Sequence, residues 1–178
     1  IDALLSKNPN NPEALLIKGN LLSIDGDASS ALAEYRKAID AKPAYLAAHS
    51  AAITALLLAN KIDDAVKQLE ALKAVAPKHP QTFYFDAQVK YQRKEFKAAR
   101  EPAQQLLRVS PNNPMALQVA GAIEFQLRSY LQAETYLAKA LQISPGLRLA
   151  RQVLIASYLR AGQPGKALDA LQPVLGSI

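Results

Sequence analysis

The sequence has 178 residues, of which half are apolar, and it contains no cysteine, so disulfides and thiolate metal sites are excluded within it. Its formal net charge is +6, a mild excess that does not by itself indicate an anionic partner. Basic residues cluster once, between Lys90 and Arg100, and such clusters are usually solvated surface. We therefore expect no nucleic-acid partner.

No apolar run approaches the roughly 18 residues that a membrane-spanning helix needs. The longest run, AAITALLLA, is shorter and is interrupted by Thr54. Because the chain begins at Ile1 in what we predict to be the middle of a helix, we expect it to be a fragment of a longer protein. Membrane contact is expected only through an anchor outside these residues.

Two residue types recur along the whole chain with a single period. Prolines stand 34 residues apart at Pro9, Pro43, Pro77, Pro111 and Pro145. Alanines keep the same spacing at Ala31, Ala65, Ala99, Ala133 and Ala167. A period of 34 that holds a helix, a tight turn and a second helix predicts an all-α solenoid of antiparallel helix pairs.

The period divides the chain into one remnant and a continuous array of five repeats. Residues 1–11 are predicted to be the end of a second helix from a preceding repeat. The repeats are predicted at 12–45, 46–79, 80–113, 114–147 and 148–178. Pro102 falls inside a predicted second helix, where proline removes a hydrogen bond, so we expect a kink or a shortened helix there. For the same reason we expect Pro173 to bend or end the last helix.

Equivalent positions of the repeats indicate how the helices pack. The twentieth position is alanine in all five repeats, which suits the close approach of two helices. The fifteenth position ends the first helix and is occupied by Gly26, Asn60, Lys94, Arg128 and Gly162. Glycine and asparagine tolerate the left-handed conformation that commonly ends a helix, so we expect a tight turn there.

These residues resemble the tetratricopeptide repeat (TPR) family over the full chain. The first repeat matches the family pattern at Gly19, Ala31, Tyr35, Ala38 and Pro43. The fourth repeat matches it at Gly121, Ala133, Leu137, Ala140 and Pro145. The resemblance implies a right-handed superhelix whose first helices line a concave groove, and a non-catalytic scaffold that binds a protein or peptide partner.

A narrower resemblance covers residues 79–175. The segments HPQTFYFDAQVKYQRKEFKAAREPAQQLL, LQVAGAIEFQLRSYLQAETYLAKAL and ARQVLIASYLRAGQPGKALDALQPVL are similar to the bacterial PEP-CTERM-system TPR lipoproteins. This likeness implies a role in exopolysaccharide production and surface-protein sorting. It also implies a location on the periplasmic face of the outer membrane, with the lipid anchor upstream of these residues.

The resemblance also indicates which side chains face the groove. The candidate partner-binding residues are Asn20, Thr54, Tyr84, Gln88, Tyr91, Gln92, Gln118, Phe125, Gln126 and Arg160. The groove is almost uncharged and rich in aromatic and amide side chains, which can stack on and hydrogen-bond a peptide backbone or a sugar ring. Tyr91 and Phe125 can equally pack between neighbouring first helices. Tyr84 and Gln88 are expected to be exposed.

The sequence shows no constellation of residues that would support catalysis. His49 and His79 lie on different repeats with no ligand at metal-binding spacing, and phosphate-loop and nucleophile-elbow motifs are absent. Asp63 and Asp64 are explained by their place at a helix start. We expect no enzyme activity, no catalytic residues, no cofactor and no metal.

Two alternatives to peptide binding remain at this stage. The array could be a polysaccharide-binding module that assists exopolysaccharide assembly or export. It could also be a structural spacer that self-associates weakly through the exposed ends of the array.

Overall fold

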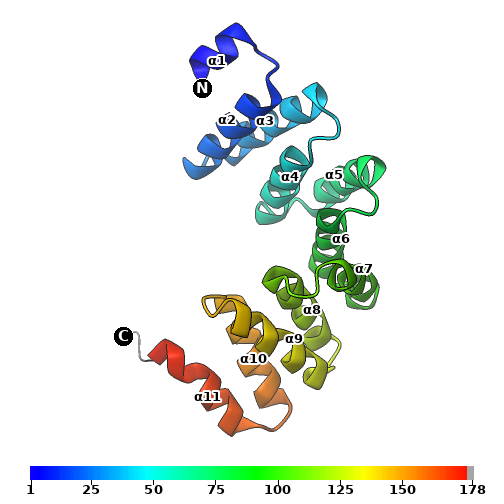
Figure 1. Cartoon of the computed structure of the whole chain (residues 1–178), viewed down its shortest axis with the longest axis vertical. Coiled ribbons are helices and arrows are strands. Elements are labelled where there is room, and N and C mark those ends of the chain that lie inside the picture. The colour runs from blue at the N-terminus through cyan, green and yellow to red at the C-terminus, as the bar shows by residue number, and fades with distance from the viewer. Residues whose placement is uncertain (176–178) are drawn as a thin grey trace. The chain divides into compact units, whose positions relative to one another are not determined.

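The computed structural model describes residues 1–175, and in that range the chain is a succession of helices joined by short turns (Figure 1). The helices are α1 (Asp2–Lys7), α2 (Pro12–Ile24), α3 (Ala28–Ala41), α4 (Leu46–Leu58), α5 (Ile62–Val75), α6 (Pro80–Gln92), α7 (Phe96–Val109), α8 (Pro114–Gln126), α9 (Tyr130–Ile143), α10 (Arg148–Arg160) and α11 (Pro164–Leu175). The all-α prediction is therefore confirmed.

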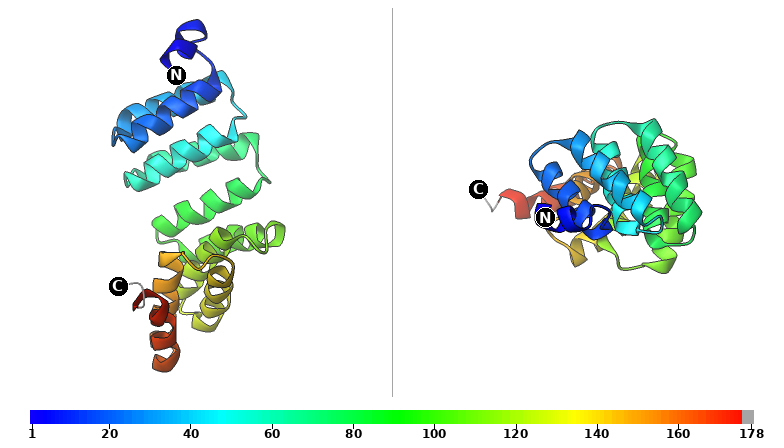
Figure 2. Two further views of the ribbon diagram at one scale, coloured as in Figure 1. Left: turned by 60° about the vertical axis from the view of Figure 1, so that its left-hand side comes forward. Right: turned by 90° about the horizontal axis from the view of Figure 1, so that it is seen from above.

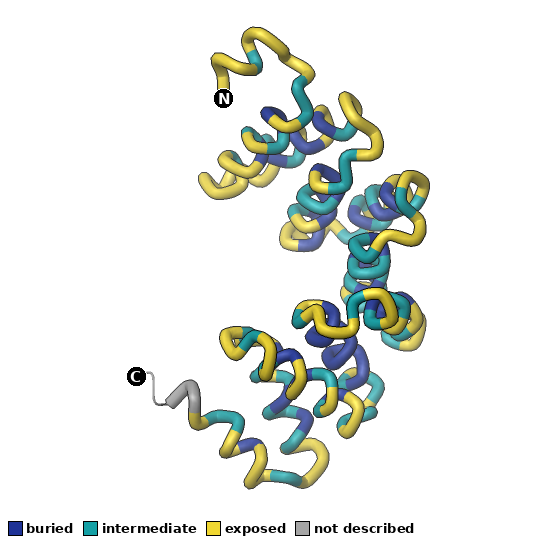
Figure 3. The backbone as a smooth tube through the Cα atoms, viewed as in Figure 1, coloured by how far each residue is buried: buried dark blue, intermediate teal, exposed yellow. Residues whose placement is uncertain are grey.

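The helices form two compact units, Ile1–Arg93 and Lys94 onward, which we describe separately. In unit 1, helix α4 contacts both α2 and α6, and these three are the first helices of their repeats. They form one layer, and the second helices α3 and α5 form another (Figure 2). In unit 2 helix α8 packs against α7, α9 and α10, and Figure 3 draws most of α8 as buried. Consecutive helices in each unit run antiparallel.

Small residues allow the two helices of a repeat to approach closely. The alanines at the twentieth position of the first four repeats are fully buried. A Cβ added to Gly19 would lie 2.4 Å from the Tyr35 ring, and one added to Gly121 would lie 2.5 Å from Leu137 Cγ. The eighth position is therefore glycine in these repeats because a large side chain of the second helix lies against its backbone.

The turn after each first helix follows one geometry even where the residue type changes. Asn60, Lys94 and Arg128 adopt positive φ values of 55°, 61° and 61°. After α4 the Lys61 N–H donates to the Leu56 carbonyl at 2.8 Å, which is the six-to-one bond of a Schellman motif. The tight turn is thus satisfied by backbone hydrogen bonds and does not depend on glycine.

Pro102 does not shorten its helix. Helix α7 has 14 residues with Pro102 inside it, the same length as α3, α5 and α9, so the predicted shortening is wrong, and the predicted kink stays a prediction. Ala99, Ala103 and Leu106 form a buried apolar face that holds α7 in place despite the lost hydrogen bond. Pro173 lies in the last turn of α11, which extends to Leu175.

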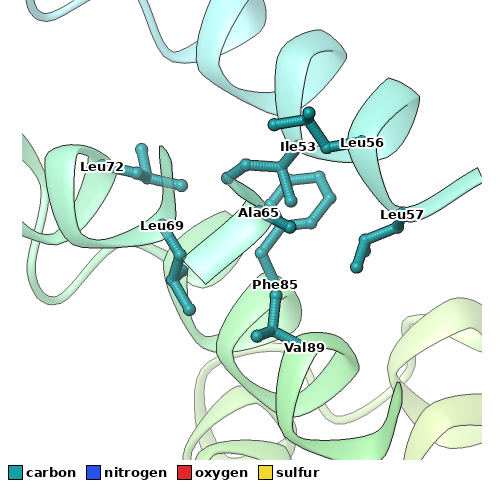
Figure 4. Packing of buried hydrophobic residues seen from close by; sticks show 8 residues of the cluster. All are labelled: Ile53, Leu56, Leu57, Ala65, Leu69, Leu72, Phe85 and Val89. Carbon is teal, nitrogen blue, oxygen red and sulfur yellow. The ribbon is translucent and has the colours of Figure 1, made fainter. Parts of the chain in front are cut away.

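The core of unit 1 joins α4, α5 and α6. Its buried residues are Ile53, Leu56, Leu57, Ala65, Leu69, Leu72, Phe85 and Val89 (Figure 4). Leu57 and Phe85 belong to this cluster and also line the pocket described below. Within residues 1–175, none of the helices has the length and hydrophobicity that a membrane span requires.

Candidate functional site

A small pocket between α4 and α6 is lined by several of the residues predicted to face the groove. Its volume is about 200 Å³. It is lined by Thr54, Leu57, Leu58, Tyr84, Phe85, Gln88 and Gln92. Four of these seven residues belong to the predicted partner-binding set, and all seven lie in unit 1. The pocket contains no charged side chain.

Helical spacing explains why these side chains meet. On α6, residues Tyr84, Gln88 and Gln92 follow one another at intervals of four, so they share one face of the helix. On α4, Thr54, Leu57 and Leu58 are likewise three and four residues apart. Because α4 and α6 pack directly against each other, these two faces enclose a common space.

Tyr84 forms a wall of the pocket. It packs against the α4–α5–α6 core, and its ring meets the Phe85 ring edge-on with centroids 5.2 Å apart. Gln88 Nε2 donates a hydrogen bond to the Tyr84 hydroxyl at 2.5 Å. Burial raises the pKa of Tyr84 and the bond from Gln88 partly opposes that rise, so the hydroxyl stays neutral at physiological pH. Tyr84 and Gln88 are half-buried, so the expectation that they would be exposed is wrong.

The mouth of the pocket combines an apolar side chain with free polar groups. Leu58 is 83% exposed, although it follows the buried Leu57 directly. Thr54 and Gln92 are also exposed. Ile24, which holds the position of Leu58 in the preceding repeat, is 81% exposed. The pocket thus places the exposed Leu58 and an apolar floor beside the hydroxyl of Thr54 and the amides of Gln88 and Gln92. Such a surface suits an extended peptide, which has apolar side chains and unpaired backbone groups.

The remaining predicted residues of unit 1 divide between structural and undetermined roles. Asn20 is exposed, but its Oδ1 accepts a hydrogen bond from the Tyr35 hydroxyl at 3.0 Å, which ties α2 to α3. Tyr91 is half-buried and lies outside the residues that line the pocket.

Unit 2 places its four predicted residues in different surroundings. Gln118 is only 8% exposed, so we remove it from the candidate binding surface. Phe125 packs against the α9–α10 cluster, and its ring centroid lies 5.8 Å from that of Tyr130. For Phe125 the packing alternative is therefore favoured. Gln126 and Arg160 are exposed.

The histidines have local structural roles. His49 is 1% exposed; its Nε2 lies 2.8 Å from the Pro43 carbonyl, and its Nδ1 lies 2.9 Å from Gln68 Nε2. Because the carbonyl can only accept and the amide nitrogen can only donate, Nε2 carries the proton and Nδ1 accepts. The exposed His79 caps α6, with Nδ1 accepting from the Gln81 N–H. Among the described residues, no group of acids and histidines is arranged to hold a metal ion.

Ion pairs engage two residues of the basic cluster, Lys90 and Arg100. Arg100 of the basic cluster makes two hydrogen bonds with Glu124, at 2.9 and 2.6 Å, and Glu124 is 5% exposed. Lys90 pairs with Asp86 at 3.1 Å. The partner of Arg100 lies 24 residues away in the next repeat, so no local sequence pattern would reveal it. Two cations of the basic cluster are therefore already paired with acidic residues of this chain.

The helix pairs and their spacing define a solenoid repeat protein. Two tetratricopeptide repeat models match the chain, one over residues 22–88 and the other over 86–147. Together they cover most of the array, and the chain belongs to the TPR family.

Solved TPR structures share this fold at low sequence identity. The chain is similar to YrrB, described as a TPR protein with an unusual peptide-binding site, with 20% identity, a TM-score of 0.67 and coverage of 96% of this chain and 88% of YrrB. A TPR protein from Parabacteroides merdae shares 16% identity and a TM-score of 0.78, with coverage of 98% of this chain and 70% of that protein. A thermophilic TPR protein from Thermus thermophilus shares 19% identity and a TM-score of 0.77, with coverage of 93% of this chain and 90% of that protein. A search of curated proteins gives no match.

Proposed function

We propose that this chain is an interaction module that binds an uncharged peptide segment of a partner protein across α4 and α6. The observation that carries the proposal is the pocket between these helices, which joins an apolar floor to Thr54, Gln88 and Gln92 without any charge. TPR folds commonly mediate protein–protein interaction. The similar protein YrrB is described as having a peptide-binding site, which supports a peptide ligand here.

The geometry suggests how such a peptide would be held. One apolar side chain would enter the pocket against Leu57 and Phe85, and Leu58 would cover it from the mouth. A pocket of about 200 Å³ can hold an apolar side chain of leucine size. The amide of Gln92 and the hydroxyl of Thr54 would pair with the peptide backbone.

We further propose a bacterial setting for this activity. The likeness of residues 79–175 to PEP-CTERM-system TPR lipoproteins supports a partner in surface-protein sorting or exopolysaccharide production. The same likeness supports a place on the periplasmic face of the outer membrane. Colocalisation of the full-length protein with an outer-membrane marker after cell fractionation tests this part independently of peptide binding.

Selection from a displayed library of random heptapeptides tests the binding proposal. We expect uncharged peptides with one or two large apolar residues to be enriched. Leu58→Lys should weaken the selected peptides about tenfold, because it removes the apolar cover and places a charge at the mouth. Leu58 is exposed, so the variant should melt with the wild-type protein.

Leu131→Lys is the matched control, because Leu131 is also exposed, at 75%, but lies on α9 of unit 2. It should leave peptide affinity unchanged. Equal loss in both variants, or no enrichment of uncharged peptides, would contradict the assignment. Saturable binding of a neutral bacterial exopolysaccharide that is lost in Leu58→Lys would instead favour the polysaccharide-binding alternative.

A further inference from the structure

Unit 2 contains a groove between its second helices α7 and α9, away from the residues predicted to bind a partner. Two adjoining pockets of about 470 and 310 Å³ form it and share Gln104 and Tyr136. The lining residues are Arg100, Gln104, Leu107, Arg108, Pro111, Leu117, Glu124, Ser129, Gln132, Thr135, Tyr136 and Lys139. The wider end is thus more than twice the volume of the α4–α6 pocket.

The wider end has an apolar base and a basic rim. Leu107 and Leu117 form the base, and the half-buried Tyr136 lies beside them without a hydrogen bond to another described residue. Arg108 is exposed and makes no ion pair within residues 1–175. Lys139 Nζ donates to the Pro111 carbonyl at 3.0 Å, a contact that leaves its positive charge uncompensated.

The acidic residue that lines the groove, Glu124, is paired with Arg100. Glu124 is the single acidic residue that lines either pocket, and Arg100 neutralises it through two hydrogen bonds. Three cations against one acid leave the groove with two positive charges, both at the end that holds the larger pocket.

The same junction in unit 1 lacks the two cations of the groove rim. The charged residues 68 positions before the groove lining are Arg36, Lys61 and Lys67 against Asp40 and Asp64. There Asp40 replaces Arg108 and Ala71 replaces Lys139. His49 and Gln68 replace Leu117 and Tyr136, and these two are hydrogen-bonded to each other at 2.9 Å. The repeat framework alone therefore does not produce the features of the α7–α9 groove.

We propose that the α7–α9 groove is a second binding surface, for an acidic peptide segment of a partner that carries a large apolar side chain. The apolar side chain would lie against Leu107, Leu117 and Tyr136, and carboxylates on either side would pair with Arg108 and Lys139. This surface is independent of the α4–α6 pocket, since all of its residues belong to unit 2.

Fluorescence anisotropy with a labelled heptapeptide, a central phenylalanine between glutamates, tests the surface. We expect saturable binding that weakens as ionic strength rises. The double variant Arg108→Glu, Lys139→Glu should bind about tenfold or more weakly. Both side chains are exposed, so the variant should fold normally.

Arg36→Glu with Lys67→Glu makes the same change in charge at the equivalent junction of unit 1. This control should keep the affinity within about twofold. An equal loss in the control would show that binding follows net charge and would overturn the proposal. Undiminished binding of a peptide with glycine in place of phenylalanine would overturn it too. So would preferential binding of an RNA oligonucleotide that is lost in the groove variant.

Discussion

The α3–α5 junction of unit 1 and the α7–α9 junction of unit 2 hold the same place in the repeat but differ in chemistry. In unit 1, His49 of α4 and Gln68 of α5 hydrogen-bond to each other, and Asp40 and Ala71 hold the positions of Arg108 and Lys139. In unit 2, Leu117 and Tyr136 stand at those positions and border a pocket with two uncompensated cations. The repeat fixes the backbone geometry, and a few side chains decide the chemistry of each junction.

The largest effect is expected from breaking the ion pair of the unit 2 junction. Arg100→Ala leaves Glu124 buried without its partner and should lower the free energy of unfolding by about 3 kcal/mol in urea denaturation. Arg108→Ala, eight residues along the same helix, removes an exposed and unpaired cation. Its unfolding free energy should stay within about 0.5 kcal/mol of wild type. Similar costs for both would show that Glu124 does not depend on Arg100.

A smaller effect is expected from converting the unit 1 junction toward the unit 2 pattern. His49→Leu removes both hydrogen bonds of the imidazole and leaves Gln68 without its partner, at a cost of about 2 kcal/mol. Adding Gln68→Leu should recover part of this loss, because both members of the pair are then apolar. Strictly additive costs in the double variant would contradict the inferred coupling.

Replacing the glycine at the eighth position should lower the free energy of unfolding by a smaller amount, and by different amounts in the two units. Gly121→Ala should cost about 1 kcal/mol, because Leu137 can change rotamer to accommodate the methyl group. Gly19→Ala should cost about 2 kcal/mol, since the rigid Tyr35 ring and the Ala31 carbonyl both lie close. Thermal melts of each variant compare them. Gly146→Ala, with no neighbour within 4 Å, should be nearly neutral and serves as the control.

The fold was largely predictable because it depends on spacing. The proline and alanine ladders depend only on which residue recurs, and they led to the all-α solenoid. Turn geometry was less predictable: Lys94 and Arg128 both take the left-handed conformation, and at Arg128 the Ser129 N–H closes the turn by donating to the Glu124 carbonyl at 2.9 Å. Pro102 does not shorten α7, because the buried face of α7 holds the helix together around the missing bond.

The residues that line the α4–α6 pocket were predicted only in part, because exposure depends on neighbouring helices. Thr54, Tyr84, Gln88 and Gln92 do share a pocket, but Gln118 at an equivalent repeat position is buried. Leu58 holds the repeat position of Gln92, 34 residues earlier, but was not among the candidate residues. The α7–α9 groove involves second helices, on which the sequence reasoning placed no partner.

The most direct test of two separate binding surfaces is a crossed binding experiment. An uncharged library-selected heptapeptide and the glutamate–phenylalanine heptapeptide are each titrated against Leu58→Lys and against Arg108→Glu, Lys139→Glu. We predict that Leu58→Lys loses only the uncharged peptide and that the groove variant loses only the acidic one. Loss of both peptides in either variant, or of neither in both, would contradict the account.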